Sequence, residues 1–492
     1  MPKDNEIAHY KMLVAGNWTN SANGETIAVQ NPANRTIFAS VPRGDAEDVD
    51  VAVTAATKAF EPWRKEQPRA RGRMLLKIAE KLEEHAEELA QIIAQETGNA
   101  IRTQARPEAI MTADIFRYFG GLASELKGET VPLGEHLLSY SRREPIGVVG
   151  AIVPWNAPLM LAALKIAPAL CAGNTIVLKT AEDAPLCILK LAEICQNELP
   201  PSVLNILTGY GHECGAALSR HPGIGKLSFT GSTNVGKEIM RTAADRIVPV
   251  SLELGGKSPN IVFPDADEDW VAEGVSMAMR FTRQSQSCTA GSRLFLHDSI
   301  FDSFLEKLVA KTDALKLGDP LDEATDMGAI INEKQFNRVC GFVEEGLETK
   351  STRLVTGGMP PSDGPLSKGN FAIPTIFADA TNDWRLAREE IFGPVLVAIR
   401  WSDEEEVIRM ANDSHYGLAA FVWTHDIGKG LRTAHAIESG WVQVNQGGGQ
   451  ILGQSYGGNK QSGIGREFSL ESMLDSFTQK KSVTVNLEAG HG

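Results

Sequence analysis

The stretch GVVGAIVPWNAPLMLAALKIAPALCAGNTIVLK, residues 147–179, joins two short β-branched runs through a longer apolar run. The runs at 147–153 and 175–179 are rich in valine and isoleucine, which is typical of strands buried on both faces. The segment 159–170 between them is long enough for a helix. A strand, a helix and a second strand in this order predict a parallel sheet with a helical crossover.

The same alternation continues toward the C-terminus. Three further strands are expected at 203–207, 226–229 and 248–254, with helices at 185–196, 213–219 and 235–244. A second set then follows, with strands at 261–263 and 293–296 and helices at 270–281 and 301–309. The chain is therefore expected to be an α/β protein with a Rossmann-like parallel sheet and a second α/β unit.

The N-terminal part combines strands and helices in another order. Strands are expected at 12–14, 26–30 and 36–41, a helix from the N-cap Asp45 to just before Pro62, and one long helix over 70–97 closed by Gly98. Alternating apolar residues and a turn at Gly134 predict a hairpin over 128–146.

Ligands of parallel sheets collect at the carboxyl ends of the strands, and two of the turns there are rich in glycine. The turn with Gly209, Gly211 and Gly215 resembles a dinucleotide fingerprint with one residue too many. The turn at 231–237 reads GxxxxGK, but Glu238 replaces the hydroxyl that would hold magnesium in an ATPase loop. Each could be an ordinary tight turn, and two in succession on one sheet favour a dinucleotide.

A single cysteine, Cys288, lies in the polar run FTRQSQSCTAGSR at 281–293. A structural cysteine is usually surrounded by apolar residues, whereas a nucleophile needs a partly exposed, polar setting that favours the thiolate. The alternative is an inert thiol in a surface loop.

Length and composition restrict the possible functions. A chain of 492 residues fits two or three domains, and a net charge of −14 without a basic stripe argues against nucleic acid. Six scattered cysteines show no zinc spacing and favour a reducing compartment. The N-terminus lacks the apolar core of a signal peptide, and no run of 18 apolar residues occurs, so a cytoplasmic protein without a membrane span is expected.

Seven motifs together resemble those of NAD(P)-dependent aldehyde dehydrogenases, in family order and along nearly the whole chain. They are PWNAP (154–158), KTAE (179–182), FTGSTNVGK (229–237), LELGGKSP (252–259), QSC (286–288), EEIFGP (389–394) and GGNKQSGIGRE (457–467). The resemblance implies an NAD-binding domain (1–127 and 147–256), a catalytic domain (257–460) and an oligomerisation element (128–146 and 470–492). It also implies a homodimer or homotetramer.

By this resemblance Cys288 is the nucleophile that adds to the aldehyde, because covalent addition gives the tetrahedral carbon from which hydride can leave. Asn156 and the Cys288 backbone N–H would stabilise the oxyanion. Glu253 would be the general base that activates water for thioester hydrolysis. Lys165 matches a lysine implicated in proton relay, although it could equally be an ordinary helix lysine.

The resemblance also implies a nucleotide site. Lys179 and Glu182 match residues that hold the adenosine ribose, and a carboxylate there favours NAD over NADP, with NADP still possible. Glu390 and Phe392 match residues that hold the nicotinamide ribose. The other expected cofactor residues are Trp155, Gly211, Gly215, Phe229, Gly231, Ser232, Gly236, Leu254 and Gly255.

Several positions depart from the family pattern. Arg283 and Ser285 replace the usual Asn and Gly of NxGQxC, and Tyr456 lies in SYGG where PFGG is usual. Relatives often carry bulky aromatic residues after the catalytic asparagine, where this chain has Ala157 and Leu164, and residues 447–449 are all glycine. These changes suggest a roomy pocket for a bulky or aromatic aldehyde, while Arg283 suggests a carboxylate-bearing semialdehyde as the alternative. The expected substrate pocket comprises Ala157, Leu164, Arg283, Ser287, Thr289, Gly448, Gln450 and Tyr456.

Two related activities fit the sequence less well. A CoA-acylating relative typically lacks the glutamate base, and a non-catalytic relative would have lost Cys288 or Asn156, so the sequence favours a hydrolytic enzyme. No metal site is expected.

Overall fold

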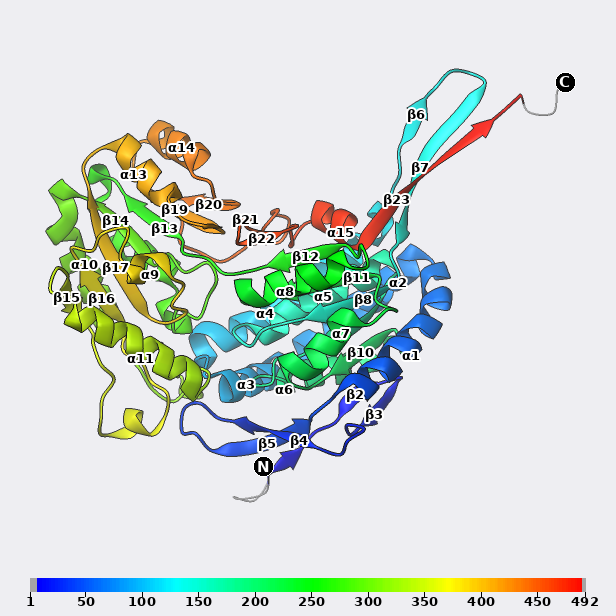
Figure 1. Ribbon diagram of the computed structural model, residues 1–492, viewed down its shortest axis with the longest axis horizontal. Helices are drawn as coiled ribbons and strands as arrows, with labels where there is room; N and C mark the ends of the chain where they lie inside the picture. Colours follow the sequence, from blue (N-terminus) through cyan, green and yellow to red (C-terminus); the bar gives the residue numbers. More distant parts are fainter. Residues whose placement is uncertain (1–6, 489–492) are drawn as a thin grey trace.

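The computed structural model describes residues 7–488, which are built around two large β-sheets (Figure 1). The first sheet has eight strands in the order β22-β12-β11-β8-β9-β10-β2-β3. Its parallel strands are β8 (Val148–Ile152), β9 (Thr175–Lys179), β10 (Leu204–Leu207), β11 (Lys226–Thr230) and β12 (Val250–Glu253). Its antiparallel edge strands are β2 (Met12–Val14), β3 (Asn17–Thr19) and β22 (Gly463–Ile464). The five predicted parallel strands are confirmed.

Successive side chains of a strand point to opposite faces of the sheet, and apolar side chains are packed on both faces here. Val149 and Ile176 pack into one core, and Val148 and Val177 into another. The first core is shared with α2 (Pro68–Glu84), α3 (Ala86–Thr97), α4 (Arg106–Gly121), α5 (Pro158–Ala172) and α6 (Leu186–Gln196). The second is shared with α1 (Ala46–Lys65), α7 (Ala216–Arg220) and α8 (Thr233–Ala244).

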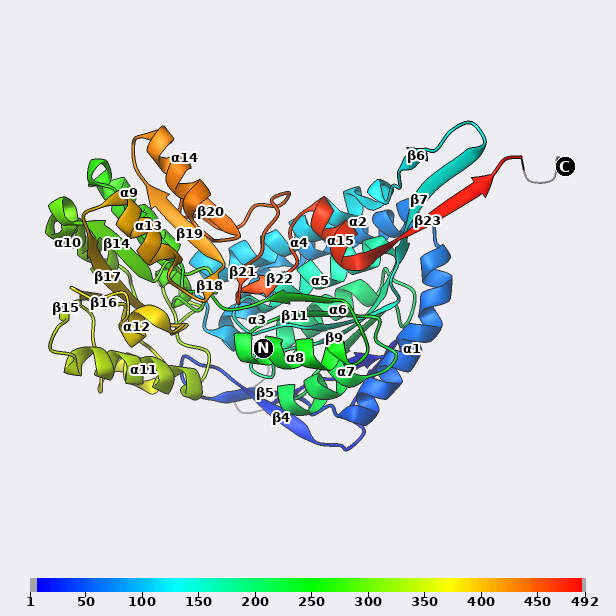
Figure 2. The ribbon, with the colours of Figure 1, turned by 45° about the horizontal axis from the view of Figure 1, so that its top comes forward.

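The second large sheet has seven strands, of which six are parallel. The strands, in spatial order, are β15 (Arg353–Thr356), β16 (Thr375–Ala378), β17 (Val395–Trp401), β14 (Arg293–His297), β13 (Pro259–Val262), β19 (Ala419–Trp423) and β20 (Trp441–Val444). Its helices are α9 (Asp269–Met279), α10 (Phe301–Asp313), α11 (Glu333–Glu348), α12 (Arg385–Arg388), α13 (Glu404–Asn412) and α14 (Ile427–Ala436). Figure 2 shows the two sheets side by side, the second on the left and the first on the right, each with its own helices.

A narrow arm projects from the body near the C-terminus (Figures 1 and 2). It consists of β6 (Thr130–Pro132), β7 (Leu137–Pro145) and β23 (Thr478–Asn486), which follows α15 (Leu470–Phe477). The predicted hairpin and its turn are confirmed, since Gly134 has φ +103°. Residues 489–492 of the predicted oligomerisation element and residues 1–6 lie outside the described part of the chain, and the division into domains stays a prediction.

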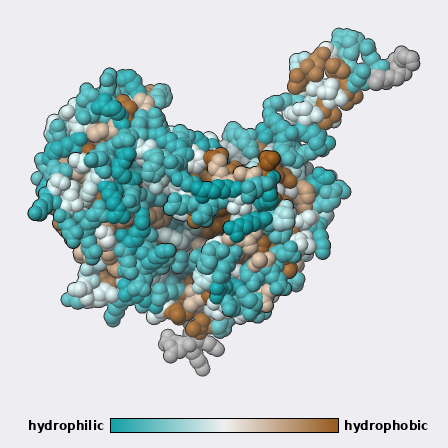
Figure 3. Space-filling view, in the orientation of Figure 1, coloured by the Kyte–Doolittle hydropathy of each residue, from teal (hydrophilic) through white to brown (hydrophobic). Residues whose placement is uncertain are grey.

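Apolar side chains are exposed on this arm, as the brown patches there show in Figure 3. They are Val131, Leu133, Leu137, Leu138, Val485 and Leu487. Exposed apolar groups of this kind mark contact surfaces.

Two helix boundaries differ from the predictions. Helix α1 continues through Pro62 to Lys65, although proline lacks the N–H that would donate a backbone hydrogen bond in the last turn. The helix predicted over 70–97 is two helices, since His85 (φ −101°, ψ 11°) leaves the helical conformation. Gly98 closes the second helix in a left-handed conformation, as expected.

Smaller elements complete the fold. An N-terminal sheet joins β1 (Ala8–His9), β5 (Ile37–Pro42) and β4 (Thr26–Gln30), and β18 (Tyr416–Gly417) pairs with β21 (Asn459–Lys460). Within residues 7–488, no helix is long and apolar enough to cross a membrane.

Candidate active site

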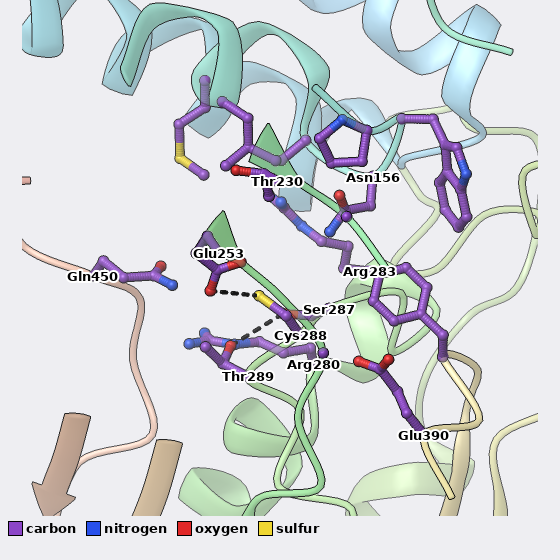
Figure 4. Close-up of a pocket in the computed structure, with 18 of the residues that line it drawn as sticks. Asn156, Thr230, Glu253, Arg280, Arg283, Ser287, Cys288, Thr289, Glu390 and Gln450 are labelled. Atoms are coloured by element: carbon purple, nitrogen blue, oxygen red, sulfur yellow. Dashed lines mark hydrogen bonds between the residues drawn. The ribbon is translucent and has the colours of Figure 1, made fainter. Parts of the chain in front are cut away.

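A cavity of about 1000 Å³ lies where the carboxyl ends of β8, β11 and β12 meet the loop that precedes β14. The segment 389–392, after α12, forms part of its wall. Figure 4 shows that Asn156, Glu253 and Cys288 point into the same space from three different segments. Parallel sheets place ligands at this edge, as the sequence predicted.

The thiol of Cys288 lies beside a carboxylate and a phenol. Its Sγ is 3.7 Å from Glu253 Oε1 and 3.5 Å from the Tyr456 hydroxyl, which donates a hydrogen bond of 2.8 Å to the same Glu253 oxygen. Glu253 and Tyr456 are almost fully buried, and Cys288 is half buried. A candidate nucleophile, a candidate base and a hydroxyl donor are therefore in mutual contact.

Asn156 is held over the nucleophile loop by its own backbone and side chain. Its Nδ2 donates to the carbonyl of Gln286 at 2.9 Å, and its carbonyl accepts from Asn99 Nδ2 at 3.2 Å. The Asn156 amide is thus fixed beside Gln286, which precedes Cys288 by two residues. From this position its N–H groups can donate to an oxyanion.

The thiol is not in a setting that favours the thiolate, contrary to the expectation from the polar sequence around it. Burial and the neighbouring Glu253 carboxylate raise the pKa of Cys288 well above its ordinary value. Burial, together with the charge of Glu467, raises the pKa of Glu253 to about 8. The sequence could not show this, because Glu253, Glu467 and Cys288 are far apart in the chain.

Lys165 does not reach the cavity. It is fully buried on α5 and forms an ion pair with Glu467. The charge of Glu467 in turn acts on Glu253. Lys165 and Glu467 therefore lie near Glu253 but outside the cavity. Glu467 was missed, although it ends the motif GGNKQSGIGRE.

The other end of the cavity is lined by Trp155, Gly231, Ser232, Leu254, Gly255, Glu390 and Phe392, all predicted cofactor residues. Gly255 leaves room for the Glu390 carboxylate, because a Cβ in its place would lie 2.3 Å from Glu390 Oε2. Glu390 accepts a hydrogen bond of 3.0 Å from the Gly256 N–H, and burial raises its pKa to about 7. The rings of Trp155 and Phe392 meet edge to face at 5.4 Å.

This end has features of a dinucleotide site. The first turn of α8 faces the cavity through residues 231–234 and contains no acidic residue, which suits a phosphate. The buried Thr230 hydroxyl has no hydrogen-bond partner within residues 7–488. The donor set therefore fits a nucleotide such as NAD.

Six predicted cofactor residues do not line the cavity. Phe229 and Gly236 are buried beneath its wall, where a Cβ on Gly236 would meet the Leu254 side chain at 2.5 Å. Lys179 and Glu182, joined at 2.9 Å, and the turn residues Gly211 and Gly215 lie beyond it, at the ends of β9 and β10.

Most of the predicted substrate residues do line the cavity, namely Ala157, Arg283, Ser287, Thr289, Gln450 and Tyr456. Leu164 does not. It is buried beside a small separate cavity with Phe119 and Phe468, because Met160 and Leu161 occupy the turn of α5 that faces the site. Gly448 is also displaced from the wall, which Gly449 forms instead.

Arg283 is already engaged by the protein. Its Nε donates to Gln104 Oε1 at 2.8 Å, and its guanidinium lies 3.8 Å from the fully buried Glu108. Glu108 also accepts from the Leu159 N–H at 3.0 Å, at the start of α5. Arg283 therefore ties α4 to the nucleophile loop.

Sequence reasoning missed several lining residues, among them the charged Arg280, which directly precedes the run 281–293. The apolar ones are Met111, Met160, Leu161, Met277 and Phe468.

The nucleophile loop has a left-handed backbone without glycine. Gln284 and Ser285 have φ +51° and +50°, a region that costs a non-glycine residue about 1 kcal/mol or more. Gln284 is held there by hydrogen bonds to Gly98 and Gln286, whereas the buried Ser285 hydroxyl has no partner within residues 7–488.

A thiol, an adjacent carboxylate and a fixed amide therefore share one cavity with residues that could hold a nucleotide. The sequence profile of the aldehyde dehydrogenase family matches residues 18–483. The chain belongs to the aldehyde dehydrogenase family, and the predictions of family, enzyme class and α/β fold are confirmed.

Individual relatives agree with this. A hydroxyisobutyraldehyde dehydrogenase of Mycolicibacterium austroafricanum is 42% identical over 97% of this chain and 94% of its own. An aldehyde dehydrogenase of Enchytraeus buchholzi is 41% identical over 98% of this chain and 97% of its own. A Bacillus cereus aldehyde dehydrogenase, solved as an NAD+ complex, superposes with a TM-score of 0.94 at 40% identity, covering 97% of each chain.

Replacing Ser285 by glycine should stabilise the protein. Ser285→Gly removes the left-handed penalty and an unpaired buried hydroxyl, so we expect the thermal midpoint to rise by roughly 1–2 °C. Gln284→Gly is the matched control: it has the same φ but loses two hydrogen bonds, so its midpoint should fall. Equal shifts in the two variants, measured by scanning calorimetry, would contradict the strain at Ser285.

Proposed function

We propose that this protein oxidises an aldehyde to a carboxylic acid through a covalent adduct on Cys288 and then hydrolyses the resulting thioester. The observation that carries the proposal is the contact of the Cys288 thiol with Glu253, 3.7 Å away in a buried cleft. Glu253 is near enough to take the thiol proton and later that of a water.

In this proposal, the carbonyl carbon bonds to Cys288 Sγ while the thiol proton moves to Glu253. The Asn156 amide and the Cys288 N–H stabilise the negative charge on the former carbonyl oxygen. Bound NAD supplies the hydride acceptor, so the carbon loses a hydride and becomes a thioester. Glu253 then gives up its proton to solvent, accepts one from water, and the attack of that water expels the cysteine sulfur with a proton.

The buried glutamate favours hydrolysis over transfer to CoA. With a pKa of about 8, Glu253 is partly ionised near neutral pH and can act as a base. Tyr456 donates to the carboxylate and keeps it directed at the sulfur. Neither transfer to CoA nor simple binding requires a glutamate base directed at the sulfur.

NAD is the cofactor. The prediction of NAD is confirmed by family membership and by neighbours solved with it. Preference for NAD over NADP is the finer proposal, supported by Glu182, whose side chain is 37% exposed beside Lys179 and would repel a 2′-phosphate.

For the substrate, we infer a bulky or aromatic aldehyde. Ala157 is small, and Met160, Leu161 and Phe468 give the cavity an apolar wall. The relative from Mycolicibacterium austroafricanum is named for hydroxyisobutyraldehyde, a branched aldehyde, which is accordingly a member of the substrate panel below.

We further infer a homodimer or homotetramer held by the arm of β6, β7 and β23, whose apolar side chains are exposed in one subunit. A cytoplasmic location is supported by six cysteines that are all free thiols. Nucleic acid and metal have no part in the proposal.

The substrate panel tests the proposal. We expect NADH formation, followed at 340 nm, with benzaldehyde and hydroxyisobutyraldehyde in preference to acetaldehyde, with NAD in preference to NADP, and without added CoA. Turnover that requires CoA would replace hydrolysis by acyl transfer. A preference for acetaldehyde would overturn the roomy pocket and leave the oxidation itself intact.

Changing Tyr456 to phenylalanine should shift the pH dependence of thioester hydrolysis. The hydroxyl stabilises the ionised form of Glu253, so Tyr456→Phe should raise the pKa of this carboxyl above about 8. Because a base acts when ionised, the hydrolysis rate should rise with pH at a higher pH than in the wild type. Single-turnover profiles measure this, with Tyr416→Phe, another tyrosine of the cavity wall, as the matched control. Coincident profiles for Tyr456→Phe and the wild type would contradict the coupling.

A further inference from the structure

We propose that Arg280 forms a binding site for an anionic group of the substrate, so that the preferred aldehydes carry a carboxylate. The inference rests on the proposed oxidation at Cys288 and names its substrate class. It assigns to Arg280 the part that the sequence suggested for Arg283.

The guanidinium of Arg280 is half buried in the cavity wall and mostly unengaged. Among residues 7–488, one NH2 donates to the Gly448 carbonyl at 2.5 Å, and no carboxylate forms an ion pair with Arg280. Arginine has five N–H donors, and a buried charge normally has a counterion. Burial and the charge of Arg283 lower the pKa of Arg280 to about 10, so it stays cationic at neutral pH.

The other two arginines of the cavity differ in this respect. Arg283 faces Glu108 and donates to Gln104. Arg338 faces Glu389 at 4.0 Å and donates to the Glu390 carbonyl at 2.8 Å. Arg280 is therefore the one cavity arginine, among the described residues, whose charge is left for a ligand.

The backbone at Arg280 is a second, independent observation. Arg280 ends α9 in the left-handed conformation, with φ +60° and ψ +36°, where glycine is the usual residue. An arginine there costs stability, and no ion pair with a described residue offsets that cost. The cost is understandable if the side chain has a function in the cavity.

The surroundings fit a carboxylate on an apolar body. Figure 4 shows the Arg280 side chain near Cys288 and Thr289, with Gln450 pointing into the same part of the cavity. Ser287 and Thr289 add hydroxyls, 3.0 Å apart. Met160, Leu161 and Phe468 line the same cavity and can pack the carbon skeleton. Glu253, with a pKa of about 8, carries little charge at neutral pH to oppose an anion.

The experiment compares isosteric aldehydes that differ only in charge. The pairs are 4-carboxybenzaldehyde with 4-formylbenzamide, and succinic semialdehyde with 4-oxobutanamide. For each pair the ratio of kcat/KM values, carboxylate over amide, is measured for the wild type, Arg280→Met, Arg280→Gly and Arg283→Met. Arg280→Gly suits the left-handed backbone and guards against a folding defect in Arg280→Met.

We expect the wild type to prefer the carboxylate in at least one pair. Both Arg280 variants should lower that ratio by about 10- to 100-fold, the range for losing hydrogen bonds to a charged group. Arg283→Met should change the ratio by less than about threefold, since Arg283 is occupied by Glu108 and Gln104. Loss of the preference in Arg283→Met with retention in the Arg280 variants would overturn the assignment, as would a wild type without preference.

A binding measurement separates this inference from the proposed function. Titration calorimetry of terephthalate and succinate against the same four proteins needs no turnover. Weaker binding in the Arg280 variants alone supports the anion site even if no aldehyde is oxidised. Equal binding in all four proteins overturns it even if the aldehydes are oxidised.

Discussion

The contact between Cys288 and Glu253 is the constraint on which the rest of the structure depends. Glu253 ends β12 of the first sheet, and Cys288 lies on the loop before β14 of the second. The position of one sheet relative to the other must therefore be fixed to within the length of a hydrogen bond. The contacts at the joint do this: Asn156 donates to Gln286, and Gly256 is so close to the Cys288 carbonyl that a Cβ would lie 2.3 Å from it.

The site contains few free charges, and its electrostatics follow from burial. The carboxyls of Glu253 and Glu390 have pKa values raised to about 8 and about 7 by desolvation, so both titrate near neutral pH. Groups of this kind can take up and release a proton within one turnover. Behind them Lys165 and Glu467 form a buried pair, and Lys226, with a pKa lowered by burial to about 7, donates to Ser251 at 2.7 Å. Charged groups thus lie behind the cavity or are paired at its rim, and Arg280 is the exception, since no carboxylate of residues 7–488 pairs with it.

The sequence predicted what depends on local pattern and motif. The five parallel strands, the N-cap Asp45, the hairpin with Gly134 and the meeting of Asn156, Glu253 and Cys288 are all present. The sequence-based prediction was wrong where tertiary packing determines which residue faces the cavity or ends a helix. The turn of α5 that faces the cavity carries Met160 and Leu161 rather than Leu164, and His85 breaks a helix whose apolar pattern is continuous. The raised pKa of Cys288 and the engagement of Arg283 depend on Glu253 and Glu108, which are distant in the chain and had no local signal.

The central claim is that Cys288 carries the acyl group and Glu253 releases it. The most direct test mixes Glu253→Gln with NAD and an aldehyde, quenches in acid and measures the mass of the peptide that contains Cys288. We predict one NADH per subunit and a stoichiometric acyl adduct on Cys288, with neither in Cys288→Ala. Continued turnover in Glu253→Gln, or NADH formation with an unmodified Cys288 peptide, would contradict the account.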